Sequence, residues 1–211
     1  MKLTKFDHSC IVIEKEGRRV VCDPVEFTTP LPELDNVVAI IITHGHGDHL
    51  QPERVSALLA RNPEAQILTV ADAVEEFDQA TAVKAGDSIN LSGFELRFFG
   101  KDHGEIIDGE VPCDNIGVVI DEMIVNPGDS FDMPEDIDSP EVLLVPSAAP
   151  WCKVNESMAY IEAVRPKIVL PVHNALLSEF GNGVYNNWLR RACEETGGEF
   201  APLSSGESID L

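Results

Sequence analysis

The most informative stretch of the sequence is VVAIIITHGHGDH, residues 37–49. Its first six residues form a continuous apolar run of strand length, and the lack of polar alternation is typical of a strand buried on both faces. Three imidazoles and one carboxylate then fall within residues 44–49. Gly45 and Gly47 let the backbone turn tightly enough to aim several of these side chains at one point. Such a density of histidine and aspartate predicts a metal site.

Three more candidate ligands lie at or near the ends of predicted strands. His103 follows FELRFFG (94–100), Asp129 lies in the turn PGDS (127–130), and His173 ends KIVLPV (167–172). Functional side chains often lie on loops that a rigid scaffold positions. Read alone, each histidine has a simpler interpretation as a hydrogen-bonded side chain, and Asp129 as a turn former.

The remaining pattern mixes strand and helix periods. A hairpin is predicted over 9–22, and a helix begins at Pro52 and stops before Asn62 and Pro63. Further strands are predicted at 66–70, 94–100, 116–126, 142–146 and 167–172, and helices at 156–164 and 184–193. Two groups of strands with helices between them and late in the chain predict a layered α/β sandwich. No linker or repeat interrupts it, so residues 1–211 are predicted to form one domain.

Charge and composition restrict the partners. The chain has 15 Lys+Arg and 37 Asp+Glu, a net charge of −22, which repels phosphate backbones and predicts no nucleic-acid partner. No apolar stretch approaches a membrane span, and the N-terminal segment MKLTKFDHSC lacks a signal-peptide core. The five cysteines are scattered, as expected in a reducing compartment. We therefore expect a cytoplasmic protein without membrane contact, and a homo-oligomer stays open.

The ordered set of candidate ligands resembles a known signature. His44-x-His46-x-Asp48-His49, followed by His103, Asp129 and His173, resembles the metal-site signature of the metallo-β-lactamase superfamily over nearly the whole chain. His8-Ser9 in the first hairpin and the short length resemble the small bacterial metal-dependent hydrolases grouped with ascorbate-6-phosphate lactonase.

The resemblance implies a four-layer αβ/βα sandwich with a dinuclear site between its two sheets. It implies that one ion is held by His44, His46 and His103, the second by Asp48, His49 and His173, and that Asp129 bridges both. Such ligands suit zinc first, and also manganese or iron. The implied activity is hydrolysis of a small-molecule ester, lactone, amide or phosphoester by a metal-bound hydroxide, with Asp48 and His8 as candidate catalytic residues.

Several neighbouring residues have open roles. His8 either donates a proton or holds substrate, or it is a structural hydrogen-bonder. Asp23 is expected to orient ligand imidazoles or fix the motif loop. Trp151 and Lys153 either line the pocket or serve as a packing group and a solvated charge. Asp7, where related hydrolases often have glycine, and the loop 101–115 depart from the resemblance and concern substrate choice.

Three other functions compete with the small-molecule hydrolase. RNA-processing nucleases share the signature, but they hold RNA with a basic patch, and this chain has only 15 basic residues. An iron-dependent redox enzyme would use the same ligands. A metal-binding protein without turnover is the third alternative.

Overall fold

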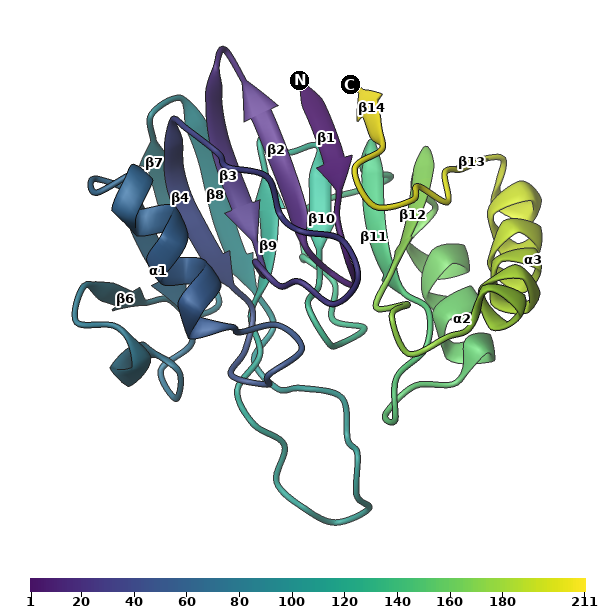
Figure 1. The fold of residues 1–211 in the computed structure, drawn as a ribbon. Coiled ribbons are helices and arrows are strands. Elements are labelled where there is room, and N and C mark those ends of the chain that lie inside the picture. The colour runs from purple at the N-terminus through teal and green to yellow at the C-terminus, as the bar shows by residue number, and fades with distance from the viewer.

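Two seven-stranded β-sheets form the centre of the molecule, a computed structural model that describes residues 1–211 (Figure 1). The first sheet has the order β14 (Ser208–Asp210), β1 (Lys2–Lys5), β2 (Ile11–Lys15), β3 (Arg18–Cys22), β4 (Val37–Ile42), β5 (Gln66–Thr69) and β6 (Ala80–Ala82). The second has the order β13 (Glu199–Phe200), β12 (Ile168–Val172), β11 (Val142–Pro146), β10 (Ile124–Asn126), β9 (Gly117–Ile120), β8 (Phe94–Phe99) and β7 (Ser88–Leu91).

Helices cover the outer face of each sheet. α1 (Pro52–Arg61) packs on the first sheet, while α2 (Val154–Val164) and α3 (Glu179–Thr196) lie together over the second. A single turn of 3-10 helix, Val74–Glu76, precedes β6. The two sheets with helices on both outer faces confirm the predicted four-layer α/β sandwich. None of these helices combines the length and the apolar character that crossing a membrane requires.

β11 shows why a strand of this fold reads as a continuous apolar run. Val142 and Leu144 belong to the core between the two sheets, whereas Leu143 and Val145 belong to the core under α2 and α3. Successive side chains of a strand point to opposite faces, so a sheet covered on both faces needs apolar residues at every position.

The predicted strand 116–126 is wrong in one respect, because the structure folds it into a hairpin. β9 and β10 pair antiparallel with Ile120 opposite Ile124, and Asp121 and Glu122 both have positive φ, at 51° and 57°. Tight hairpin turns of this kind usually carry asparagine or glycine, so Asp-Glu gave no turn signal. The predicted hairpin 9–22 and the strand 37–42 agree with β2, β3 and β4.

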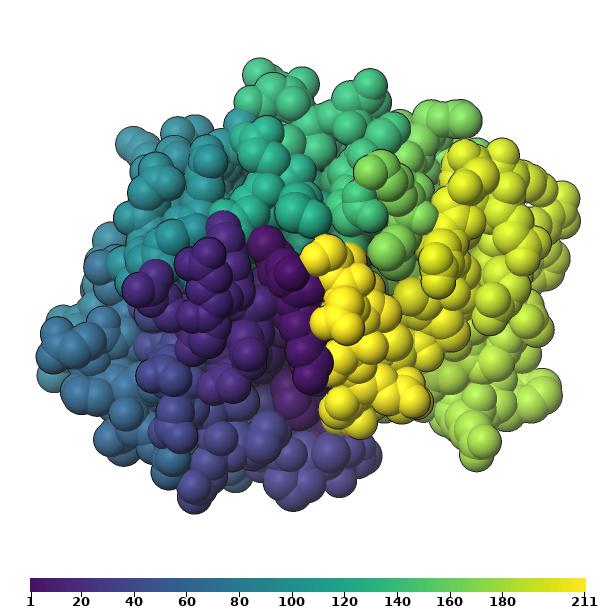
Figure 2. Space-filling model, turned by 90° about the horizontal axis from the view of Figure 1, so that it is seen from above, coloured from purple at the N-terminus to yellow at the C-terminus, as the bar shows by residue number.

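Strand direction brings distant residues to one edge of the sandwich. β1, β3 and β4 run parallel in the first sheet, and β8, β10, β11 and β12 run parallel in the second. Six of these strands end shortly before candidate residues, namely β1 before His8, β3 before Asp23, β4 before His44, β8 before His103, β10 before Asp129 and β12 before His173. The opposite edge, seen in Figure 2, carries the two chain ends, where β14 pairs with β1.

Candidate metal centre

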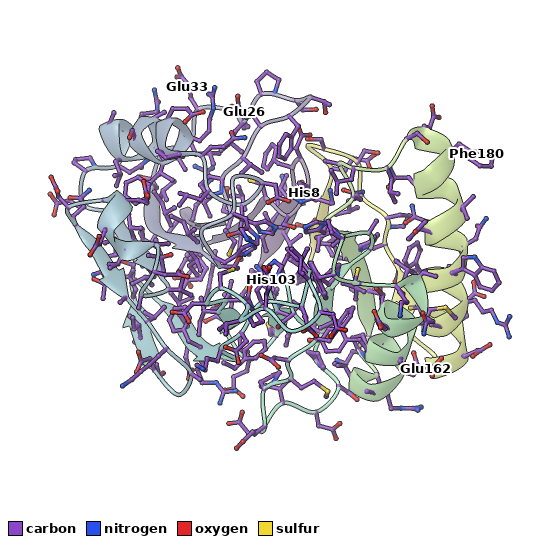
Figure 3. All side chains as sticks on the ribbon, turned by 90° about the horizontal axis from the view of Figure 1, so that it is seen from below. His8, Glu26, Glu33, His103, Glu162 and Phe180 are labelled. Carbon is purple, nitrogen blue, oxygen red and sulfur yellow. The ribbon has the colours of Figure 1, made fainter.

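Seven side chains from four strand ends converge at this edge of the sandwich. The nitrogen atoms of His44, His46 and His103 that could bind a metal lie within 4.8 Å of one another. A second group with the same spacing contains Asp48, His49 and His173, together with His8. Figure 3 views the molecule from this edge and shows His8 and His103 near its middle. The first group contains the residues of one ligand set that the resemblance implies, and the second contains those of the other set with His8 added. A third group, His44, His49 and Asp129, joins the two.

Asp129 lies between the two groups. Its Oδ1 is 3.2 Å from His49 Nε2, and its Oδ2 is 2.9 Å from His173 Nε2 and 3.4 Å from His103 Nε2. The carboxylate thus contacts histidines of both groups, which is the position that a bridging ligand needs.

The proton positions of the histidines follow from their outer partners. Nδ1 of His103 lies 2.6 Å from the carbonyl oxygen of Gly104, and Nδ1 of His173 lies 2.8 Å from that of Ala148. A carbonyl oxygen only accepts, so each Nδ1 donates and the neutral ring turns the lone pair of Nε2 toward Asp129. Two lone pairs that face each other repel unless a proton or a cation lies between them.

Asp23 and Thr43 orient two further rings from behind. Asp23 is fully buried and accepts hydrogen bonds from the Thr43 amide (2.8 Å) and the Thr43 hydroxyl (2.9 Å), and its Oδ2 lies 2.8 Å from His49 Nδ1. Because the Thr43 hydroxyl donates its only proton to Asp23, its oxygen accepts a hydrogen bond from His44 Nδ1 at 3.0 Å. Asp23 therefore stands where the sequence predicted, behind the ligand imidazoles.

His8 has the opposite proton arrangement. Its Nδ1 accepts a hydrogen bond from the Ala175 amide at 3.2 Å, so a neutral His8 carries its proton on Nε2. That Nε2 is 3.3 Å from Asp48 Oδ2. Burial lowers the pKa of His8 to about 4, although Asp48 opposes the shift. At neutral pH His8 is thus an uncharged ring that presents an N–H group to the centre.

The ionisation of His44, His46 and Asp129 suits metal binding. Burial, with the neighbouring histidines, lowers the pKa of His44 and His46 and keeps both rings neutral. Burial works against a charge on Asp129, but the neighbouring His49 holds the pKa of its carboxyl well below the usual value. Burial also works against a charge on His49, but Asp129 and Asp23 raise the pKa of His49 well above its usual value, so it must release a proton to bind a metal. Neutral imidazole and ionised carboxylate are the forms that bind metals.

Five buried atoms at the centre lack a hydrogen-bond partner. One is Nε2 of His8, and the other four are Nε2 of His44, His49 and His103 and Oδ1 of Asp129. Leaving such polar atoms buried and unsatisfied costs free energy, so native proteins satisfy nearly all of them. Divalent cations would satisfy these last four atoms, and the residues therefore fit a metal.

Two residues that sequence reasoning missed or left open hold Asp129. Asn115 Oδ1 accepts a hydrogen bond from the Asp129 amide (2.9 Å), and the Trp151 indole Nε1 donates to Asp129 Oδ2 (2.8 Å). Trp151 lies over Gly104, where an added Cβ would come within 2.2 Å of the indole ring. Lys153 is 81% exposed and lies 4.0 Å from Glu156. No spacing rule in the sequence signals the Asn115 and Trp151 contacts.

Three residues of the centre have backbone conformations that are rare outside glycine. The φ angles of His8, Asp23 and His173 are 57°, 46° and 54°. Non-glycine residues in this left-handed region carry strain, which tends to occur at functional sites. All three sit where a strand of the scaffold turns into the site.

Residues 2–173 match the family model described as the beta-lactamase superfamily domain. The chain belongs to the metallo-β-lactamase superfamily. Among curated relatives, Protein Rv0786c of Mycobacterium tuberculosis is 31% identical over 99% of both chains. A UPF0173 metal-dependent hydrolase of Carboxydothermus hydrogenoformans is 26% identical over 89% of this chain and 86% of the relative.

A solved structure of similar fold is Igni18, a metallo hydrolase from the archaeon Ignicoccus hospitalis. It has a TM-score of 0.75 and 20% identity, and the match covers 99% of this chain and 97% of that one. The predicted superfamily is confirmed by the family model over residues 2–173, and the fold shared with Igni18 covers 99% of the chain.

Proposed function

We propose that this protein is a metal-dependent hydrolase that cleaves an ester, lactone, amide or phosphoester in a small molecule at a dinuclear centre. The observation that carries the proposal is the set of four buried, unpartnered ligand atoms between the two sheets. Superfamily membership and relatives named as metal-dependent hydrolases support it.

We assign the proposed ligands to two ions. His44, His46 and His103 would hold one ion, Asp48, His49 and His173 the other, and Asp129 would contact both. The nitrogen-rich set favours Zn²⁺, with Mn²⁺ or Fe²⁺ as substitutes. When bound, such ions supply a water of lowered pKa and polarise the bond under attack.

The protein side chains supply orientation and a hydrogen-bond donor. Asp48 is 36% exposed, whereas His8 and His173 are 1% exposed, so the centre opens to solvent on the Asp48 side. His8 Nε2 has no aligned hydrogen-bond partner, and its N–H is free to donate a hydrogen bond to a leaving-group oxygen or to another oxygen of the substrate. Asp48 Oδ2 lies 3.3 Å from that nitrogen.

The test is metal content after purification and reconstitution with zinc. His46→Ala and Asp129→Ala are expected to lose at least one bound ion per chain and to abolish hydrolysis across ester, lactone and phosphodiester substrates. Asp78→Ala, which removes an exposed carboxylate between the 3-10 turn and β6, is the control and should keep both. Unchanged metal content in both site variants would refute the assignment.

The proposal also covers the partners of the protein and its location in the cell. With a net charge of −22, the protein should bind no tRNA even at low salt, and binding with a steep salt dependence would instead support the nuclease alternative. Iron in the natively expressed protein would support the redox alternative. We propose the cytoplasm as its location, from the scattered cysteines.

A further inference from the structure

The loop between β8 and β9 carries exposed apolar side chains beside the centre. Ile106, Ile107 and Val111 are 49%, 55% and 93% exposed. Isolated surface hydrophobics need no explanation, but three on one loop of a chain with a net charge of −22 form a local apolar surface.

This surface is continuous with the metal centre. A cavity of about 180 Å³ is lined by His46 and His103 together with Ile106, Ile107 and Val111. A substrate bound at the centre would therefore reach the apolar side chains.

Backbone hydrogen bonds fix the base of the loop, and the apolar side chains at its tip line the cavity. The His103 amide donates to Cys113 O (3.0 Å), the Asn115 amide to Lys101 O (2.8 Å), and the Gly104 amide to Asp129 O (2.7 Å). These bonds tie the loop to a proposed ligand and to the residue that holds it. The apolar residues at the tip belong to neither of the two buried cores.

The charges that line the cavity also affect which substituents it can bind. Its lining includes Glu105 and Glu110 and contains no lysine or arginine. Glu105 Oε1 accepts a hydrogen bond from the Gly109 amide at 2.7 Å, but Glu110 is exposed and has no such partner. Apart from the ions proposed at His46 and His103, nothing in the lining would offset the repulsion between these carboxylates and an anionic substituent.

A second apolar group lies at the other side of the centre. Phe27 is 47% exposed, and its ring meets His8 edge-on at 5.6 Å between centroids. The Asp7 carboxylate fixes the segment, because Oδ2 accepts from the amides of Phe27 (2.9 Å), Thr28 (2.6 Å) and Thr29 (2.8 Å). The metal centre thus lies between two apolar walls.

We infer that the cavity under Ile106, Ile107 and Val111 is a substrate pocket that takes an uncharged acyl or alkyl group attached to the bond being cleaved. This inference rests on the proposed hydrolase function and narrows it to neutral substrates with a short apolar chain. Each methylene buried in such a pocket raises kcat/KM by up to about fourfold.

The experiment uses the zinc-loaded full chain and p-nitrophenyl esters with a constant leaving group. Across acetate, butyrate and hexanoate, kcat/KM is expected to rise by more than tenfold. The succinate monoester, close in length to butyrate but carrying a carboxylate, should be the poorest substrate. The double variant Ile106→Ser with Ile107→Ser should flatten the rise, whereas Phe180→Ser, an 83% exposed site on α3 far from His8 and His103 in Figure 3, should keep it.

A second measurement does not depend on turnover. Calorimetry with 2-octanone, a neutral ketone that cannot be hydrolysed, should show binding that the double variant weakens at least fivefold and Phe180→Ser leaves unchanged. Hydrolysis without chain-length preference would overturn the pocket and leave the proposed function intact. Absence of all hydrolysis would count against the function, and ketone binding would then decide the pocket alone.

Discussion

At the scale of single residues, the position of one proton separates His8 from its neighbours. The rings of His103 and His173 give their outer N–H to carbonyl oxygens and turn a lone pair inward, whereas His8 accepts at its outer nitrogen and turns an N–H inward. A lone pair binds a cation and an N–H does not. Histidine therefore has two roles within one cluster, as a metal ligand and as an N–H donor. The hydrogen-bond partner of the outer ring nitrogen distinguishes the two roles.

His8→Asn tests this separation. Asparagine tolerates the positive φ of the site, but its shorter side chain cannot place the N–H where the imidazole does. We expect kcat to fall about 100-fold or more while metal content stays at the wild-type level. Metal analysis and steady-state kinetics on the same preparation check this, and loss of an ion would make His8 a ligand instead.

Trp151 is expected to act through Asp129. Trp151→Phe keeps a flat ring over Gly104 but removes the N–H that holds Asp129 Oδ2. Loss of a hydrogen bond to a ligand typically weakens metal binding by about 10- to 100-fold. Competition with a chelator measures the affinity, Trp188→Phe on α3 is the control, and equal affinity in both variants would contradict the role.

At the scale of elements, the Asp7 carboxylate organises the segment that carries Phe27. Burial works against its ionisation, but the amides of Thr28, Thr29 and Phe27 outweigh this and lower the pKa of Asp7 from 3.8 to about 2. A lowered folded-state pKa stabilises the protein above pH 3.8, and this contribution disappears as the pH falls toward 2.

Asp7→Asn is therefore expected to destabilise the protein in a pH-dependent way. Its cost in the free energy of unfolding should be about 2 kcal/mol at pH 7 and should shrink below pH 4. Urea unfolding of wild type and variant at pH 7 and pH 3 measures the difference. A cost that is the same at both pH values would show that the charge of Asp7 contributes nothing.

The elements that could be predicted are those whose packing or ends require a recognisable local pattern of residues. β4 and β11 are apolar at nearly every position because both faces are covered, and α1 begins at proline and ends at Asn62. The turn at Asp121 and Glu122 and the short strands β6, β7 and β14 carry no such pattern. The proposed ligand positions were predicted from strand ends and a resemblance, but the contacts of Trp151 and Asn115 with Asp129 depend on how loops meet in space.

At the scale of the whole molecule, the centre links the two sheets. His44, His46, Asp48 and His49 follow β4 of the first sheet, whereas His103, Asp129 and His173 follow strands of the second. A metal bound only by the folded chain stabilises it by mass action, by about 2.7 kcal/mol at one hundred times the dissociation constant.

Metal removal is therefore expected to lower the unfolding temperature. For a chain of this size, about 2.7 kcal/mol corresponds to roughly 5–10 °C. Calorimetry with zinc and with excess chelator measures the shift, and Asp129→Ala should reduce it sharply. Identical unfolding temperatures in wild type with and without zinc would show that no metal connects the sheets.

The left-handed backbone at His8 and His173 has an evolutionary consequence. Side chains other than glycine pay about 1–2 kcal/mol for this conformation, so the two histidines are held there at a cost to the fold. In a lineage released from selection for activity, these positions should drift early toward glycine or asparagine while the apolar strands stay unchanged. Glycine or asparagine at both positions would therefore identify a member of this superfamily that has lost its activity but kept its fold.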